Sequence, residues 1–244
     1  PWRRPSMVLA DGGVSFRGAI GFDLDGRIYI GERWLWEGRY IASNGHVQWF
    51  EAGWDADDTS VVVDRSRVRM SSAIYREFGH GTYVGMVHRA LFTELDDEPG
   101  DFVQGLGGVL RHDTRTGLGT FKRGHLLETR VVHFGRFTEL ALDGRGYIAG
   151  WSGITFSGRL ALIHRMGFVP ESAYVELGGE TLRGSAEARY RDESLAVAQV
   201  HLGLPIWGRL RASAFAELGQ VYGGPPGVGP AWSVGVGVNL ILIP

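Results

Sequence analysis

The feature that most limits the fold of this chain is an alternation of apolar and polar residues with a period of two. The segment 231–243 shows it best, with one large apolar face and one small polar face. The apolar face carries Trp232, Val234, Val236, Val238, Leu240 and Leu242, and the other face carries Ser233, Gly235, Gly237 and Asn239. Successive side chains of a β-strand point to opposite faces, whereas a helix repeats every 3.6 residues. Because helical periodicity is poor throughout, the sequence predicts an all-β protein.

Twelve segments carry this alternation, and clusters of Gly, Asp, Asn and Pro separate them. They are residues 13–23, 27–42, 46–55, 60–78, 82–95, 101–115, 124–134, 137–150, 152–168, 192–204, 208–221 and 231–243. Strands of soluble proteins usually have about 5–6 residues, whereas a tilted membrane strand needs about 9–11. Most of these segments are long, and an even strand number is typical of bacterial barrels. We therefore expect residues 1–244 to form a single closed antiparallel transmembrane β-barrel of about 12 strands. A soluble all-β domain is the alternative.

Charged residues gather on one face of several predicted strands, which a water-filled or ion-paired interior tolerates. The candidate interior Arg residues are Arg65, Arg67, Arg69, Arg89, Arg111, Arg130, Arg145 and Arg159. The candidate partners for part of this set are Glu128, Glu139, Asp143 and Glu217. We expect an interior plugged by paired charges and a loop, with a pore for anions as the alternative.

The connections divide into short turns and longer loops, as in membrane barrels. Ser43-Asn44-Gly45 and Gly79-His80-Gly81 are predicted tight turns at one end. The other end receives residues 55–59, 96–100, 222–230 and one long connection, 169–191. A loop of that length is usually functional or disordered. An aromatic girdle would explain Trp34, Trp36, Trp49, Trp54, Trp207 and Trp232, although core packing would also explain some of them.

Composition excludes several function classes. The net charge of −2 argues against nucleic-acid binding, which usually needs a strong basic excess. The sequence contains no uncharged apolar stretch of about 18 residues, so a membrane-spanning helix is not expected. The absence of Cys excludes disulfides and thiolate metal sites. No charged and apolar leader follows Pro1, so we expect either a processed chain or a fragment of a longer one.

A search for catalytic constellations yields no strong candidate, so neither a catalytic residue nor a cofactor or metal is predicted. The His residues show no HExxH spacing, and there is no G-x-S-x-G elbow. His88 with Ser71 or Ser72 is the conceivable pair, but nothing selects it. The acidic residues Asp55, Asp57, Asp58, Glu94, Asp96, Asp97 and Glu98 could bind Ca²⁺ through oxygen ligands, although solvated loop charges are the favoured interpretation.

Four motifs in order resemble the BamA/TamA superfamily of outer-membrane barrels. Residues 105–124, GLGGVLRHDTRTGLGTFKRG, resemble its strand–turn pattern through Asp113, Thr114, Arg115 and Gly124. Residues 177–191, LGGETLRGSAEARYR, resemble its long loop. Two further segments resemble the strands that follow this loop in the family. They are LAVAQVHLGLPIWGRLRASAFAELGQVY at 195–222 and SVGVGVNLIL at 233–242. The chain departs from the family at Ser185, where an aromatic residue is usual, and in lacking POTRA domains and two final strands.

The resemblance implies that the long loop folds into the barrel, where an Arg meets an acidic residue of the wall. The matching residues are Arg183, Gly184, Arg189 and Glu217, and the alternation also places Glu217 inside. It further implies a weak seam at the last strand, with Gly235, Gly237 and Asn239, that offers an edge to clients.

The implied function is protein insertion into, or translocation across, the bacterial outer membrane. The implied partners are membrane lipid, lipopolysaccharide and client proteins, with no nucleic acid, and no enzymatic activity is expected of the barrel itself. One alternative is a membrane anchor or exporter for a separate passenger hydrolase. A lipid-modifying outer-membrane enzyme is the other alternative.

Overall fold

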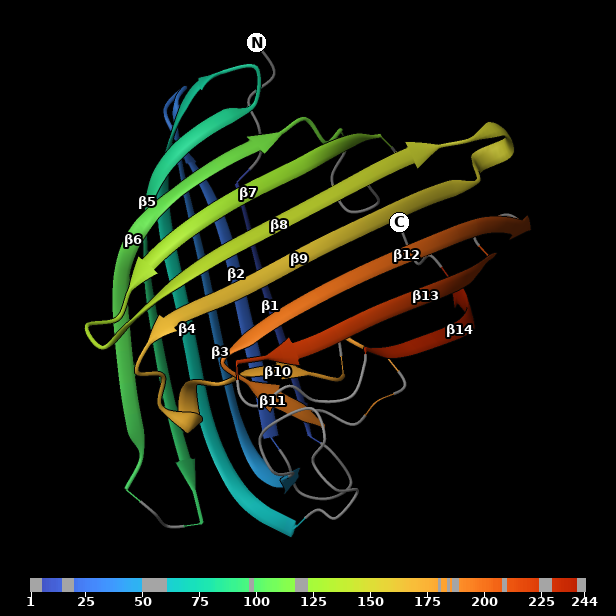
Figure 1. The fold of residues 1–244 in the computed structure, drawn as a ribbon. Helices are drawn as coiled ribbons and strands as arrows, with labels where there is room; N and C mark the ends of the chain where they lie inside the picture. Colours follow the sequence, from blue (N-terminus) through green and yellow to red (C-terminus); the bar gives the residue numbers. More distant parts are fainter. Residues whose placement is uncertain are drawn as a thin grey trace.

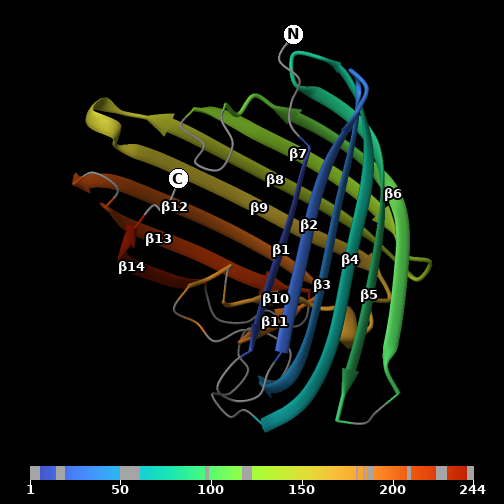
Figure 2. The same ribbon diagram turned by 180° about the vertical axis from the view of Figure 1, so that it is seen from behind.

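The computed structural model describes residues 6–14, 20–49, 61–96, 99–116, 123–179, 181–183, 185, 189–207, 210–223 and 230–240. Within these residues twelve strands form one antiparallel sheet, in the order β1-β2-β3-β4-β5-β6-β7-β8-β9-β12-β13-β14 (Figures 1 and 2). The strands are β1 Met7–Val14, β2 Ile20–Ile30, β3 Trp34–Trp49, β4 Val61–Gly79, β5 Thr82–Leu95, β6 Asp101–Asp113, β7 Gly124–His133, β8 Phe137–Ala149, β9 Thr155–Gly167, β12 Ser194–Trp207, β13 Leu210–Tyr222 and β14 Ala231–Leu240. A separate two-stranded sheet pairs β10 (Val175–Leu177) with β11 (Tyr190–Asp192).

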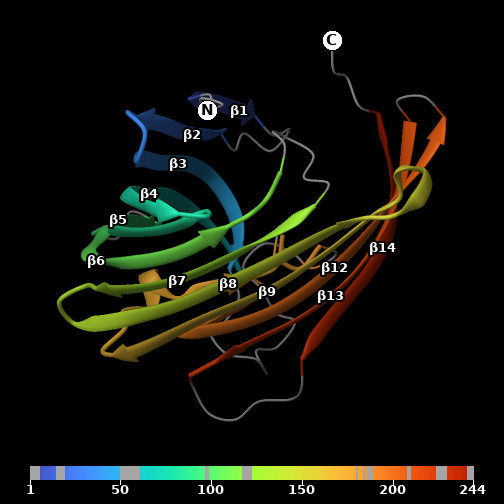
Figure 3. The same cartoon turned by 90° about the horizontal axis from the view of Figure 1, so that it is seen from above.

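The large sheet curls into a partial barrel, with β1 and β14 as its two edges (Figure 3). Long twisted strands coil a sheet in this way, and closure requires pairing of the first strand with the last. Within the described residues, this large sheet has the predicted twelve strands. The predicted closure is not observed, because no pairing joins β1 to β14 within the residues that the structure describes.

Nine of the predicted strands match the observed ones within a few residues, but the first three are wrong. The predicted turn Ser43-Asn44-Gly45 lies inside β3, where Asn44 is opposite Ile20 of β2 and Ser66 of β4. Ladders on both sides satisfy the backbone groups there and outweigh the local turn preference of Asn-Gly. The observed turn between β2 and β3 spans residues 31–33 and begins at Gly31, whose φ is +64°. The turn at 79–81 is confirmed.

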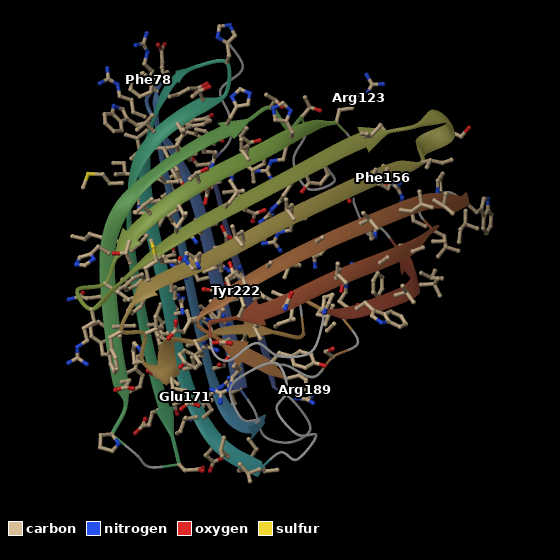
Figure 4. All side chains as sticks on the ribbon, viewed as in Figure 1. Phe78, Arg123, Phe156, Glu171, Arg189 and Tyr222 are labelled. Atoms are coloured by element: carbon tan, nitrogen blue, oxygen red, sulfur yellow. The ribbon has the colours of Figure 1, made fainter. Side chains whose placement is uncertain are left out.

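The two faces of the sheet have opposite chemistry, as the alternation predicts. The outer face is apolar and exposed: Val236 of β14 is 86% exposed, and the labelled Phe78 and Phe156 are 65% and 46% exposed (Figure 4). The inner face buries charge, since Arg65 and Arg67 of β4 are only 4% and 6% exposed. An apolar exterior around a polar interior is the pattern of a membrane barrel and the reverse of a soluble β-domain.

Three apolar clusters lie among the inner side chains. One runs across the inner face from β3 to β7 and contains Leu35, Ala73, Tyr75, Tyr83, Val87, Val109 and Val132. Two others join the wall to the connection between β9 and β12 and contain Val175, Leu177, Leu182, Leu195, Val197 and Val221, and Phe137, Val169 and Ala173. The described residues contain no helix long and apolar enough to span a membrane. The only helical segments among them are the short 3-10 turns Trp151–Gly153 and Glu171–Ala173.

Candidate functional site

The connection between β9 and β12 covers residues 168–193, and we call it the inner loop. Its described parts, 168–179, 181–183, 185 and 189–193, lie on the concave side of the sheet (Figure 1). Its β10–β11 hairpin carries Val175 and Leu177, which pack on Leu195 and Val221 of the wall. Gly219 of β13 permits this approach, because a Cβ added there would lie 2.6 Å from Leu177 Cδ1. Burial of this apolar surface holds the loop inside.

A first polar anchor joins the inner loop to β13. The Arg183 Nε donates to Glu217 Oε1 at 2.7 Å, and the Arg183 backbone N–H donates to Glu217 Oε2 at 2.6 Å. Gln199 Nε2 and Ser233 Oγ also donate to this carboxylate, at 3.2 and 3.1 Å. The Arg183 guanidinium lies over the Phe215 ring, 3.8 Å from its centroid. The fully buried Glu217 carboxylate therefore has hydrogen-bond donors from the loop, β12 and β14.

A second anchor, absent from the sequence predictions, joins the inner loop to β4 on another part of the wall. Glu176 of β10 pairs with Arg65 Nη1 at 3.0 Å and Arg67 Nη1 at 2.5 Å. Burial by itself raises the pKa of Glu176, but the charges of Arg67 and Arg65 outweigh it, so the pKa lies below its ordinary value. The alternating Arg residues of β4 indicated the basic half of this anchor in the sequence. No sequence feature near Glu176 identified it as their acidic partner.

Further contacts hold the start of the inner loop. Arg165 of β9 donates from Nη1 to the Ala173 carbonyl, and its Nε and Nη2 both donate to Glu139 Oε2, at 3.1 and 2.8 Å. Thr93 Oγ1 of β5 donates to the Ser172 carbonyl at 3.4 Å. Arg191 Nη2 donates to Glu171 Oε1 at 3.0 Å within the loop. The inner loop is thus tied to β4, β5, β9 and β13 at once.

Arg189 and Gly184 are the remaining loop residues predicted from the family resemblance. Figure 4 labels Arg189 and Glu171 in the region of the inner loop. The Arg189 guanidinium lies 4.8 Å from the centroid of the Tyr190 ring. Gly184 lies outside the described residues.

The predicted strand–turn residues lie together where β6 passes to β7. Arg115 Nε and Nη2 donate to the two carboxylate oxygens of Asp113, at 2.9 and 2.8 Å. The Thr114 N–H donates to the His125 carbonyl at 2.9 Å, and the His125 N–H donates to Thr114 Oγ1 at 3.0 Å. Gly124 has φ +109°, and a Cβ there would lie 2.5 Å from the Thr114 carbonyl oxygen. The motif therefore fixes the geometry of this hairpin end.

The three residues predicted for the seam lie on β14, where they face β13. Gly235 is opposite Phe215, Gly237 is opposite Ser213, and Asn239 is opposite Arg211. A Cβ at Gly235 would come within 2.4 Å of the Phe215 ring, so this glycine makes room for the aromatic side chain under Arg183. The other side of β14 has no strand partner within the described part of the chain.

Other interior charges pair much as the residue pattern predicts. Glu128 pairs with Arg111 and Arg130, and Asp143 pairs with Arg145 and Arg159. Glu139, whose side chain is fully buried, pairs with Arg89, Arg130 and Arg165. The predicted Arg set therefore lines the inner face mainly in ion-paired form.

In the described part of the chain one His ring contacts a Ser hydroxyl, and this pair differs from the pair of His88 with Ser71 or Ser72 considered from the sequence. His164 Nδ1 lies 3.2 Å from Ser194 Oγ. Ser194 is 1% exposed, and its Oγ also accepts a hydrogen bond from the Arg165 backbone N–H. Ser72 instead accepts a hydrogen bond from Trp36 Nε1, at 3.0 Å. Among the described residues there is no group of three His, Asp or Glu that could hold a metal ion, and the 55–58 and 97–98 parts of the acidic set lie outside them.

Comparison with known proteins places this geometry among solved structures. No protein-family model matches the sequence, and no curated protein matches it. BamA from Haemophilus ducreyi, in a crystal structure lacking POTRA domains 1–3, superposes over 90% of this chain with a TM-score of 0.56 and 11% identity. CdiB from Acinetobacter baumannii superposes over 97% of this chain with a TM-score of 0.53 and 12% identity. The chain shares the fold of BamA and CdiB. It spans 58% of the BamA chain and 53% of the CdiB chain.

Proposed function

We propose that this chain is a bacterial outer-membrane barrel of the BamA/TamA type that takes part in inserting proteins into, or translocating them across, that membrane. The observation that supports it best is the inner loop, anchored by Arg183 on Glu217 within a fold like that of BamA and CdiB. Residues 1–244 act as a single membrane unit in this proposal. Its partners are outer-membrane lipid, lipopolysaccharide and client polypeptides.

The proposed action requires no covalent chemistry. An unpaired strand edge carries a row of N–H and C=O groups that can pair with another chain. In the described residues β1 and β14 each have a strand on one side only. The inner face of β14 carries Gly235 and Gly237, which add no side-chain contacts of their own to the ladder with β13. A client segment could add to this edge as a strand, with main-chain hydrogen bonds supplying the attraction.

The experiment restricts the edges with a covalent link. The chain has no Cys, so Val8→Cys in β1 and Val236→Cys in β14 can be joined with bis-maleimides of graded length in the full-length protein in its native membrane. We expect the linked protein to lose client insertion or translocation and each single variant to keep it. The matched control links Leu110→Cys to Thr129→Cys, because these residues are already opposite each other in β6 and β7.

Loss of function in the edge-linked protein alone supports the proposal. Unchanged client transfer after complete linking would overturn it and favour a barrel that anchors a passenger domain. Loss of function in the control as well would show that the barrel must deform elsewhere, which also contradicts an edge mechanism.

A further inference from the structure

Arg76 of β4 is an exposed cation close to the turn that joins β4 to β5. The outer face of β4 runs through Ile74, Arg76 and Phe78, because successive side chains of a strand alternate between its two faces. Ile74 and Phe78 are exposed apolar residues, and Figure 4 labels Phe78 at this end of the barrel. Arg76 therefore belongs to the surface that meets the membrane.

The neighbours of Arg76 on the outer face are apolar. The cross-strand row at its level contains Ile30 of β2, Trp34 of β3, Val84 of β5 and Leu110 of β6. All four are exposed large apolar side chains. One positive charge thus interrupts an apolar row that runs from β2 to β6. A charge on the lipid face is destabilising at the membrane midplane but is tolerated near the interface, where lipid headgroups lie.

Two aromatic rings flank the Arg76 guanidinium. Its Cζ lies 5.9 Å from the centroid of the Trp34 ring and 5.6 Å from the centroid of the Phe78 ring. The ring faces attract the cation but leave the N–H donors at the edge of the guanidinium plane available. Within the residues that the structure describes, no carboxylate pairs with Arg76, and the residues opposite it on β3 and β5 are Trp34 and Val84. The chain therefore holds a cation here for which the described residues supply no anion.

The connections show which leaflet of the membrane Arg76 faces. The turns at its end of the barrel include 31–33 and 79–81, whereas the opposite end carries the connections 50–60 and 168–193. Outer-membrane barrels have short periplasmic turns and longer extracellular loops. This asymmetry places Arg76 in the periplasmic leaflet, which consists of phospholipids, and away from the lipopolysaccharide leaflet.

We infer that the outer face around Arg76 binds one phospholipid of the periplasmic leaflet through the phosphate group of that lipid. The guanidinium donates to two phosphate oxygens, because its planar pairs of N–H groups match a phosphate bidentately. The acyl chains run along Ile74 and Met86, which are exposed and lie opposite each other, two positions farther from the turn than Arg76 and Val84. The site requires only a barrel in the outer membrane and is independent of client transfer.

The test is native mass spectrometry of the full-length barrel, released from a nonionic detergent, with dioleoylphosphatidylglycerol as the ligand. Dioleoylglycerol serves as the probe with the same chains and no phosphate, and a dioleoyl trimethylammonium lipid serves as the probe of opposite charge. We expect saturable binding of the first phosphatidylglycerol molecule. Both probes should bind about fivefold more weakly or worse, as expected for one basic residue beside an anionic lipid.

Three variants locate the site. Arg76→Gln should weaken phosphatidylglycerol binding about fivefold or more. Phe78→Leu keeps every charge and removes one ring, so it should weaken binding about two- to fivefold. The matched control, Arg123→Gln, should leave binding within about twofold, because Arg123 is exposed at the same end but precedes β7, three strands away from β4. The heat-dependent shift of barrels on gels checks that each variant is folded.

The inference is overturned if phosphatidylglycerol shows no saturable first binding event or binds no tighter than dioleoylglycerol. It is equally overturned if folded Arg76→Gln binds as the wild type does, or if Arg123→Gln weakens binding as much, because the overall positive charge would then be responsible. Lipid A is the other source of a lipid phosphate. If Arg76→Gln weakens lipid A binding and leaves phosphatidylglycerol binding unchanged, the assignment to the phospholipid leaflet is wrong.

Discussion

Replacing Glu217 with Gln removes the charge on which the first loop anchor depends. Four hydrogen bonds end on this fully buried carboxylate, two of them from Arg183. Removing one partner of a buried ion pair costs about 3–5 kcal/mol. The Arg183 side chain is 43% exposed, so water can solvate it once the partner is gone, and the expected loss falls to about 2–3 kcal/mol. A loss of that size corresponds to an increase of about 30- to 150-fold in the undocked population of the loop.

Hydrogen exchange measured by mass spectrometry on the folded barrel reports this population. The peptide that contains Leu182 and the Arg183 N–H should exchange about 30- to 150-fold faster in Glu217→Gln, while β6 and β7 keep wild-type exchange. Asp23→Asn is the matched control, since Asp23 pairs bidentately with Arg39 away from this anchor. Unchanged exchange at Arg183 in Glu217→Gln would refute the reasoning, because the apolar packing of the loop would then be sufficient by itself.

The second anchor should weaken at acid pH, because the pKa of Glu176 is lowered in the folded protein. Its contribution to loop stability is complete above the ordinary pKa of 4.5 and is lost as the pH falls through the lower folded value. Cleavage of the loop by pepsin should therefore accelerate in that range, and Glu176→Gln should flatten this pH dependence. Gly219→Val should displace Leu177 and release the hairpin, because the added Cβ would lie 2.6 Å from a Leu177 methyl; loop exchange should rise, and an unchanged rate would contradict the close packing. Gly124→Ala should destabilise the β6–β7 end by about 1–3 kcal/mol, measured as faster exchange of that hairpin, since its φ of +109° and the nearby Thr114 carbonyl both oppose a side chain.

The residue pattern was sufficient for the features that depend on local alternation. Parity alone placed Arg65, Arg67 and Glu217 inside and the valines of β14 outside, and burial agrees at each position. The predicted strand boundaries were wrong in the first fifty residues, where the dipeptide Asn44-Gly45 has the composition of a turn but lies inside strand β3. Whether such a dipeptide turns depends on the backbone partners available on either side, and those come from β2 and β4.

Sequence by itself determined the all-β class, the two chemically opposite faces and the presence of a long loop, because side-chain direction in a strand repeats every two residues. The tertiary structure alone decided which charges meet. Glu176 and Arg65 are 111 positions apart, and only the curvature of the sheet and the inward path of the loop bring them to 3.0 Å. Distances across a curved sheet depend on register and coiling summed over many strands, which no local pattern encodes.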